Sequence, residues 1–327
     1  MKKTDLLQAL EIVKPGLANR EKIEQSTSFA FIEGKVVTYN DEISLSHPVE
    51  GLDITGAVQA AELYELLRKI KQDDIEISVE DNEIQIKAGK ATAGLTLHQE
   101  IKLPLEEIGE AGKWKTIPEG FLNAVKMSIY STGKNLGEPL LTCVHVNENG
   151  YIEGSDGLRI IRYQINKMPV KTFLIPYGSA SEVVKLNPIK IAEGKGWIHF
   201  KTEKGTIMSC RIFEEAYPET SGFLKVNGVC FVFPQGINDI LDRAMVFSSD
   251  TVNIKLDKKK ISIKSESEAG WFEESANVRY EDKALSFIIA PVLLKNILSE
   301  TLNCTYDEKL LKFEGENWVY VAAININ

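Results

Sequence analysis

Near its N-terminus the chain contains Leu6-Leu7-Gln8-Ala9-Leu10-Glu11-Ile12-Val13, whose apolar residues recur with the period of an α-helix. Two similar segments follow, Phe121-Leu122-Asn123-Ala124-Val125-Lys126-Met127 and Ile237-Asn238-Asp239-Ile240-Leu241-Asp242-Arg243-Ala244-Met245. Their starting points, residues 6, 121 and 237, are separated by 115 and 116 positions. Self-similarity at a fixed spacing is the signature of a repeated structural unit, so the sequence predicts three copies of one unit.

Each helical segment is followed by the same series of expected elements. Alternating apolar and polar residues predict hairpin strands at 29–32 and 35–39, at 141–146 and 151–154, and at 252–256 and 261–264. A second helix is expected at 60–70, 177–186 and 291–298. Paired strands then close each unit, at 75–79 with 83–87, at 197–202 with 206–211, and at 304–306 with 310–313.

The length of 327 residues also favours several domains, because single cores stop growing at about 250–300 residues. We expect an α+β fold of three repeated domains, each with two helices on antiparallel sheets. The boundaries are predicted at 1–110, 111–219 and 220–327. Three unrelated α+β domains are the alternative, which the matched spacings disfavour.

Composition sets limits on function. The net charge of −9 argues against a protein that wraps nucleic acid with a basic outer surface. No apolar run is long enough for a membrane helix, and polar residues interrupt the N-terminal segment too early for a signal peptide, so a cytoplasmic protein is expected. The four cysteines form no C-x-x-C pair, and we expect neither a metal nor a cofactor.

The motifs of common enzyme sites are missing from the sequence. It contains no G-x-x-x-x-G-K-[ST], G-x-G-x-x-G, G-x-S-x-G or H-E-x-x-H pattern. Ser155-Asp156-Gly157 is better explained as a turn than as part of a carboxylate site. We therefore expect no catalytic residues.

Four local motifs, in order, resemble the bacterial DNA sliding clamp, the beta subunit of DNA polymerase III. Ser155-Asp156-Gly157-Leu158-Arg159-Ile160 resembles the family's T-D-G-H-R-L. The segment 209–218, SCRIFEEAYP, resembles its S-R-L-x-E-G-x-F/Y-P, and Leu103-Pro104 with Ile108 resembles its L-P-x-x-x-F/Y. In the opening segment, Arg20 lies at the position of a DNA-contacting arginine. The resemblance spans the whole chain.

The sequence also departs from the family pattern. Leu158 replaces the histidine and Ser155 the threonine of T-D-G-H-R-L, and the C-terminal residues 321–327 lack the usual M-P-M-R-L ending. The chain is shorter than typical chromosomal clamps. These differences indicate a divergent member, of the kind that a phage or mobile element carries, and they leave partner specificity less defined than the fold.

The resemblance implies a curved half-ring that pairs head to tail with a second copy and encircles duplex DNA without reading its sequence. Topological closure requires only loose cationic contacts, so the negative charge can lie on the outside. The expected DNA-binding residues are Arg20, Lys22, Arg68, Lys71, Lys126, Lys134, Lys185 and Lys190. The other basic candidates are Lys14, Lys69, Arg243 and Lys295. For each of them a solvated surface role is the alternative, because carboxylates lie on the same segments.

The resemblance further implies two protein-binding surfaces. An apolar pocket would receive a short Q-L-x-L-F-like peptide of DNA polymerase, clamp loader or repair proteins. Its expected residues are Leu141, Ser155, Leu158, Arg159, Ile160, Ile324 and Ile326. Ring closure would use Ile108 of the first domain and Val246 and Phe247 of the third. Core packing is the alternative for Leu141, Ile160 and the three ring-closure residues.

Two other functions remain open at this point. One is a clamp-like scaffold that binds replication proteins without encircling DNA. The other is a hydrolase or transferase whose repeats frame a cleft, which would require a deep pocket with clustered acids.

Overall fold

The structure is a computed structural model that describes residues 1–134, 137–307 and 309–326. It contains two compact units. Unit 1 comprises Met1–Pro118 and Met168–Glu214, and unit 2 comprises Glu119–Lys167 and Glu215–Asn327. The division into three domains remains a prediction.

Unit 1 is built on an antiparallel sheet with the strand order β4-β1-β2-β3-β15-β14-β13-β8. The bounds of these strands are β1 Ser28–Ile32, β2 Lys35–Tyr39, β3 Ile43–Pro48, β4 Gly56–Gln59, β8 Lys115–Thr116, β13 Lys190–Glu193, β14 Trp197–Lys201 and β15 Ile207–Arg211. A second sheet contains β5 (Glu76–Glu80), β6 (Glu83–Ala88) and β7 (Ala91–Thr96). The unit also contains β12 (Phe173–Pro176) and a 3-10 turn at Leu105–Ile108.

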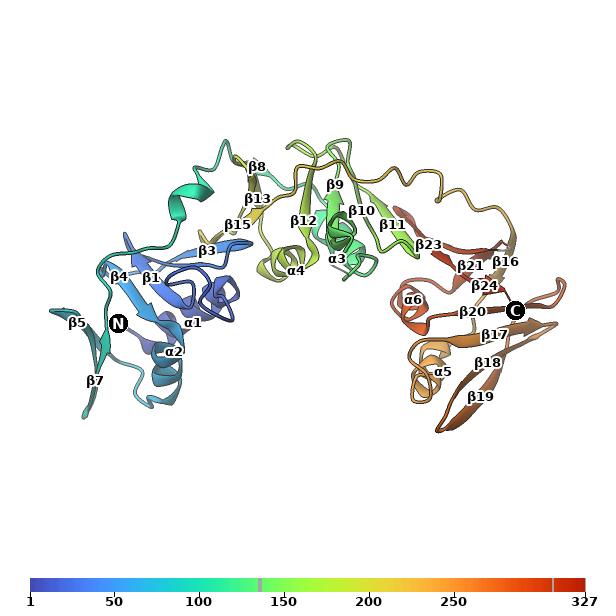
Figure 1. Cartoon of the computed structure of the whole chain (residues 1–327), viewed down its shortest axis with the longest axis horizontal. Helices are drawn as coiled ribbons and strands as arrows, with labels where there is room; N and C mark the ends of the chain where they lie inside the picture. The colour runs from blue at the N-terminus through green and yellow to red at the C-terminus, as the bar shows by residue number, and fades with distance from the viewer. Residues whose placement is uncertain (135–136, 308, 327) are drawn as a thin grey trace. The chain divides into compact units, whose positions relative to one another are not determined.

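The helices of unit 1 are α1 (Lys3–Val13), α2 (Ala60–Lys69) and α4 (Tyr177–Leu186). Leu6, Leu10 and Val13 recur at helical spacing and are fully buried, which directs one face of α1 toward β2 and β3 (Figure 1). The helix ends where Pro15 begins a short 3-10 turn at Lys14–Gly16. The helices predicted at the N-terminal segment, at 60–70 and at 177–186 are confirmed.

Unit 2 repeats the same arrangement of strands. Among the residues of unit 2, the strands of its larger sheet follow the order β9-β10-β11-β23-β22-β21-β16, and a second sheet has the order β19-β18-β17-β20-β24. The bounds are β9 Cys143–Val146, β10 Tyr151–Ser155, β11 Arg159–Gln164, β16 Val229–Val232, β17 Val252–Asp257, β18 Lys260–Ser267, β19 Gly270–Asn277, β20 Leu285–Ile289, β21 Asn303–Tyr306, β22 Leu310–Glu314, β23 Trp318–Ala323 and β24 Asn325–Ile326.

The helices of unit 2 are α3 (Phe121–Ile129), α5 (Ile237–Ala244) and α6 (Pro291–Lys295), and 3-10 turns lie at Pro139–Thr142 and Ile297–Ser299. Helix α3 packs on β10 and β11, whereas α5 packs on β18 and β19 (Figure 1). Helix α6 is shorter than the predicted 291–298 because the last turn is 3-10. The predicted hairpins and closing strand pairs lie within one or two residues of the observed strands, except that β18 extends three residues beyond the predicted 261–264. Among the described residues no helix is long and apolar enough to cross a membrane.

Candidate functional site

The turn between β10 and β11 is held by its own side chains. The Ser155 hydroxyl donates to the Arg159 carbonyl at 2.7 Å and accepts the Gly157 N–H at 3.2 Å. One Asp156 oxygen accepts the N–H groups of Leu158 and Arg159, both at 3.0 Å, and the other binds the Arg159 guanidinium at 2.9 Å. Gly157 adopts a φ of +86°, which favours glycine. The motif therefore builds a rigid turn whose tip, Leu158, is 61% exposed.

Three other segments of unit 2 meet this turn. The Leu158 carbonyl accepts the N–H of Ala323 at the end of β23, at 2.7 Å. The Arg159 guanidinium reaches the carbonyl of Val292 on α6 at 3.4 Å, and the Val292 side chain is 46% exposed. Leu141 lies beside Gly157 and is half-buried. The turn, the start of α6 and the Leu141 segment thus gather partly exposed apolar side chains around one fixed arginine.

The remaining predicted pocket residues lie in different surroundings. Ile160 is 5% exposed and packs with Val226 and Val321 in a small cluster separate from the main core. Ile324 is buried in the main core of unit 2, so the core role fits it better than a pocket role. The backbone of Ile326 pairs with Phe287, while its side chain lies outside the described part of the chain. Of the predicted pocket residues, Leu141, Leu158 and Arg159 therefore lie together at the turn that Ser155 helps to hold, and the pocket itself remains a prediction.

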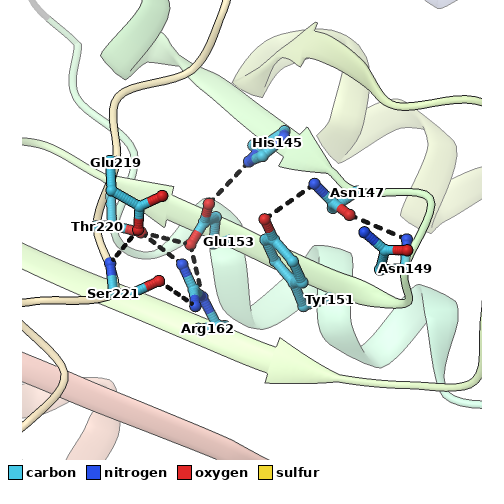
Figure 2. Close-up of polar contacts among 9 residues, drawn as sticks. All are labelled: His145, Asn147, Asn149, Tyr151, Glu153, Arg162, Glu219, Thr220 and Ser221. Carbon is cyan, nitrogen blue, oxygen red and sulfur yellow. Dashed lines mark hydrogen bonds and ion pairs between the residues drawn. The ribbon is translucent and has the colours of Figure 1, made fainter.

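A buried glutamate lies on the strand that leads into this turn, and the sequence motifs did not indicate it. The Glu153 side chain is 2% exposed. It accepts hydrogen bonds from His145 at 2.8 Å, from Arg162 at 2.8 Å and from Thr220 at 2.8 Å (Figure 2). Burial alone would raise the pKa of Glu153, but these partners hold the pKa below its ordinary value.

Thr220 belongs to an irregular segment of unit 2, residues 217–226, which we call the strap. The Arg162 guanidinium also donates to the hydroxyls of Thr220 at 2.7 Å and Ser221 at 3.0 Å (Figure 2). The Tyr217 ring stacks on His145 with centroids 4.8 Å apart. Burial raises the pKa of Tyr217, so its hydroxyl stays neutral.

Two of the predicted DNA-binding cations are paired with acids on their own helices. Arg68 binds Glu65 at 2.9 Å and Lys185 binds Glu182 at 2.7 Å. Within the described residues, the other six are exposed and form no ion pair: Arg20, Lys22, Lys71, Lys126, Lys134 and Lys190. Arg20 and Lys22 line an open cavity of about 490 Å³ in unit 1, together with Asn40 and Glu42.

The three predicted ring-closure residues differ in accessibility. Val246 is 78% exposed. Phe247 is half-buried and stacks on Phe272 of β19, an edge strand, with ring centroids 6.5 Å apart. Ile108 is buried in unit 1 in one cluster with Tyr39 and Trp197, so its predicted interface role is not supported and the core alternative fits it. Among the residues that the structure describes, no cluster of three or more His, Cys, Asp or Glu is arranged to hold a metal ion.

Comparison with known proteins relates the chain to one fold. No family model matches the sequence, and no curated protein matches it. A crystal structure of the DNA polymerase III subunit beta from Pseudomonas aeruginosa matches with a TM-score of 0.85 and 16% identity, over 100% of this chain and 99% of that chain. The DNA polymerase sliding clamp from Bacillus subtilis matches with a TM-score of 0.82 and 18% identity, over 100% and 98%.

The beta subunit from Thermotoga maritima matches with a TM-score of 0.82 and 17% identity, over 99% of this chain and 98% of that chain. Matches over nearly the full length of both chains confirm the α+β fold that the sequence predicted. The chain has the fold of DNA polymerase III beta subunits.

Proposed function

We propose that the protein is a DNA sliding clamp, a processivity factor that encircles duplex DNA as a head-to-tail homodimer. The observation that carries this proposal is the full-length likeness in fold to sliding clamps, at TM-scores of 0.82 and 0.85. The sequence repeat at 115 and 116 positions supports it, because it predicts the three clamp domains at 1–110, 111–219 and 220–327. We place this protein in the cytoplasm and assign it no catalytic activity.

The distribution of charge fits a ring that holds DNA by topology. A tight grip on phosphates would slow sliding, whereas a closed ring prevents escape without strong affinity. A net charge of −9 discourages binding to DNA from the outside. The unpaired cations, such as Lys71 and Lys126, would supply the weak positive potential that the hole requires.

We further propose that DNA polymerase and the clamp loader bind beside Leu158. Apolar clefts with a few polar anchors bind short peptides. Leu158, Val292 and Leu141 provide partly exposed apolar surface, and Arg159 provides a donor held by Asp156. A Q-L-x-L-F-like peptide would place an apolar side chain against this surface.

The test of the ring uses DNA topology. The protein is loaded onto nicked circular duplex with a bacterial clamp loader and ATP, and the DNA is then cut once or left intact. We expect the intact circle to retain the protein and the cut DNA to release it. Equal retention on the intact and the cut DNA would contradict the ring mechanism. Light scattering on the same protein, measured without DNA or loader, should give about twice 36.5 kDa.

One observation favours a second candidate, a clamp-like scaffold that binds replication proteins without encircling DNA. Besides Arg68 and Lys185, Arg243 is paired with Glu274 at 2.8 Å and Lys295 is paired with Asp242. Pairing of helix-borne cations lowers the potential available to DNA. A ring-sized dimer that the loader never retains on circular DNA would support this scaffold.

A further inference from the structure

The strap is attached to the sheet of unit 2 by two unlike contacts. At one end, Thr220 is bonded to both Glu153 and Arg162 (Figure 2). At the other end, Val226 is 2% exposed and packs with Ile160. Glu153 lies on β10, Arg162 and Ile160 lie on β11, and the strap follows them in sequence by more than fifty positions. The polar contact therefore fixes where a distant segment crosses the strand that leads away from Leu158.

The apolar end of the strap forms part of a small cluster next to the partner site. Leu224 and Val226 pack with Ile160 and Val321, apart from the main core of unit 2. Ile160 is two residues from Leu158, and Val321 is two residues from Ala323, whose N–H binds the Leu158 carbonyl. The cluster is thus continuous along both strands with the partly exposed surface at the turn.

We propose that Glu153 is a positioning residue for the partner site: by holding Thr220, it fixes the strap so that the partly exposed Leu224 forms an apolar wall beside Leu158. The inference rests on the proposed function, because the wall acts on a peptide that docks at this turn. A wall that is already in place binds more tightly than one that must be ordered on binding, since ordering a segment costs free energy.

The charge of Glu153 is essential to this role. A neutral amide of the same shape keeps an oxygen that can accept from both Arg162 and Thr220. Arg162 would nevertheless lose its buried counter-ion, and both hydrogen bonds would weaken, because a charged acceptor binds more strongly than a neutral one. The strap would then be held mainly by Leu224 and Val226. We expect it to open more often without loss of the sheet beneath it.

The experiment measures affinity and local opening in the same variants of the full chain. Glu153→Gln removes the charge, and Thr220→Val removes the strap's hydroxyl while keeping its size. The probe is a synthetic peptide of sequence QLSLF, titrated by fluorescence anisotropy. Hydrogen exchange of residues 217–226 is followed by mass spectrometry.

Two control variants lie in unit 2 away from the strap. Glu266→Gln breaks the ion pair with Lys264, which is 2.8 Å long, on β18. Ser265→Ala removes a buried hydrogen bond to the Ala244 carbonyl, which is 2.7 Å long. These controls separate an effect on the strap from a general loss of charge or of stability.

We expect peptide affinity to fall about tenfold in Glu153→Gln and somewhat less in Thr220→Val, with faster exchange confined to the strap. Both control variants should bind as the parent does. Parental affinity in Glu153→Gln and Thr220→Val would overturn the positioning role and leave the proposed function standing. Weaker binding without faster exchange of the strap would also overturn it. If the parent itself binds no peptide, the partner site fails, and the role of Glu153 fails with it.

Discussion

The turns that precede β3 in unit 1 and β11 in unit 2 occupy the same place in two sheets of the same strand order, yet their surfaces differ. In unit 1, Asn40 accepts the N–H groups of Glu42 and Ile43, at 3.2 and 3.0 Å, as Asp156 does in unit 2. Glu42 occupies the place of Leu158. The backbone conformation of the turn is therefore shared, while the exposed residue at its tip is acidic in unit 1 and apolar in unit 2.

The strand paired with each turn explains the rest of the difference. In unit 1, β15 ends in Arg211, whose guanidinium binds the Asp41 carbonyl at 2.8 Å and the Asp41 carboxylate at 2.7 Å. The same group lies 4.7 Å from the Trp197 ring centroid. In unit 2, β23 ends in Ala323, which is too small to cover the turn. The comparison suggests why a chain with repeated sheets would bind its partner peptide at one turn only.

The segments that pack over the two sheets differ in the polarity of the contacts that hold them. In register, Val37 of β2 pairs with Ala30 and Ser46, whereas Glu153 of β10 pairs with His145 and Arg162. The cover of unit 1, residues 101–108, packs through Leu103 and Ile108, and the ion pairs that Lys102 and Glu107 form are exposed. The strap of unit 2 is held by a buried charged contact at Thr220 in addition to the apolar packing of Val226. A charged contact fixes one arrangement, whereas apolar packing tolerates small shifts.

The strongest test of the apolar turn is Leu158→Asp. A carboxylate there would have to lose its water against the apolar side chain of the peptide, which costs several kcal/mol when the charge stays unpaired. Since about 1.4 kcal/mol corresponds to a factor of ten, we expect QLSLF affinity to fall at least 100-fold in a titration. Because Leu158 is 61% exposed, folding should be unaffected. Asp41→Asn in unit 1 is the matched control, and unchanged affinity in Leu158→Asp would place the peptide elsewhere.

Ala323→Arg would place an arginine at the unit 2 turn, as Arg211 is placed at the unit 1 turn. The new guanidinium would lie at the end of β23, beside Leu158 and within reach of Asp156. We expect about a tenfold loss of peptide affinity, because the arginine must be displaced or shared when the peptide docks. Ala323→Leu serves as the control for size. A parental affinity in Ala323→Arg would show that the end of β23 does not border the site.

Arg211→Ala removes the guanidinium that binds Asp41 at the unit 1 turn. The ion pair is exposed and contributes little, so most of the loss should come from the contact with Trp197. We expect the free energy of unfolding to fall by about 1 kcal/mol in urea denaturation, with no change in peptide affinity. Lys195→Ala, at an exposed position of the same unit, is the control. A gain of peptide binding in Arg211→Ala would mean that the unit 1 turn is a masked second site.

The sequence predicted the parts of this comparison that depend on local patterns. Apolar spacing located the helices and hairpins, and Ser155, Asp156 and Gly157 fix their turn through hydrogen bonds to near neighbours. It did not reveal the bond between Glu153 and Thr220, which joins residues 67 positions apart. The burial of Ile324 was missed, and that of Ile108 was left as an alternative to an interface role, because periodicity shows that a residue is apolar but not whether a segment of its own chain covers it.

The smallest expected effect concerns acid. The pKa of Glu153 is lower in the folded chain than its ordinary value of 4.5, so its stabilising charge is present above that value and is lost as the pH falls through the lowered pKa. The groups that face it are His145 on β9, Arg162 on β11, and Tyr217 and Thr220 on the strap. Tyr217 is neutral in this range, and Arg162 keeps its charge and its bonds to the strap, so the strap should loosen without detaching.

We therefore expect hydrogen exchange of residues 217–226, corrected for the intrinsic rate at each pH, to quicken as the sample is acidified from about pH 6 to about pH 3.5. Residues 101–108, the cover of unit 1, should keep their protection, because the two ion pairs that they form, Lys102 with Glu24 and Glu107 with Arg211, are exposed and contribute little. The Glu153→Gln variant should exchange at the quicker rate throughout and show no step in the strap. A step that persists in this variant would assign the transition to another carboxylate. Equal loosening of both covers would remove the difference between the two sheets that the charge of Glu153 is proposed to create.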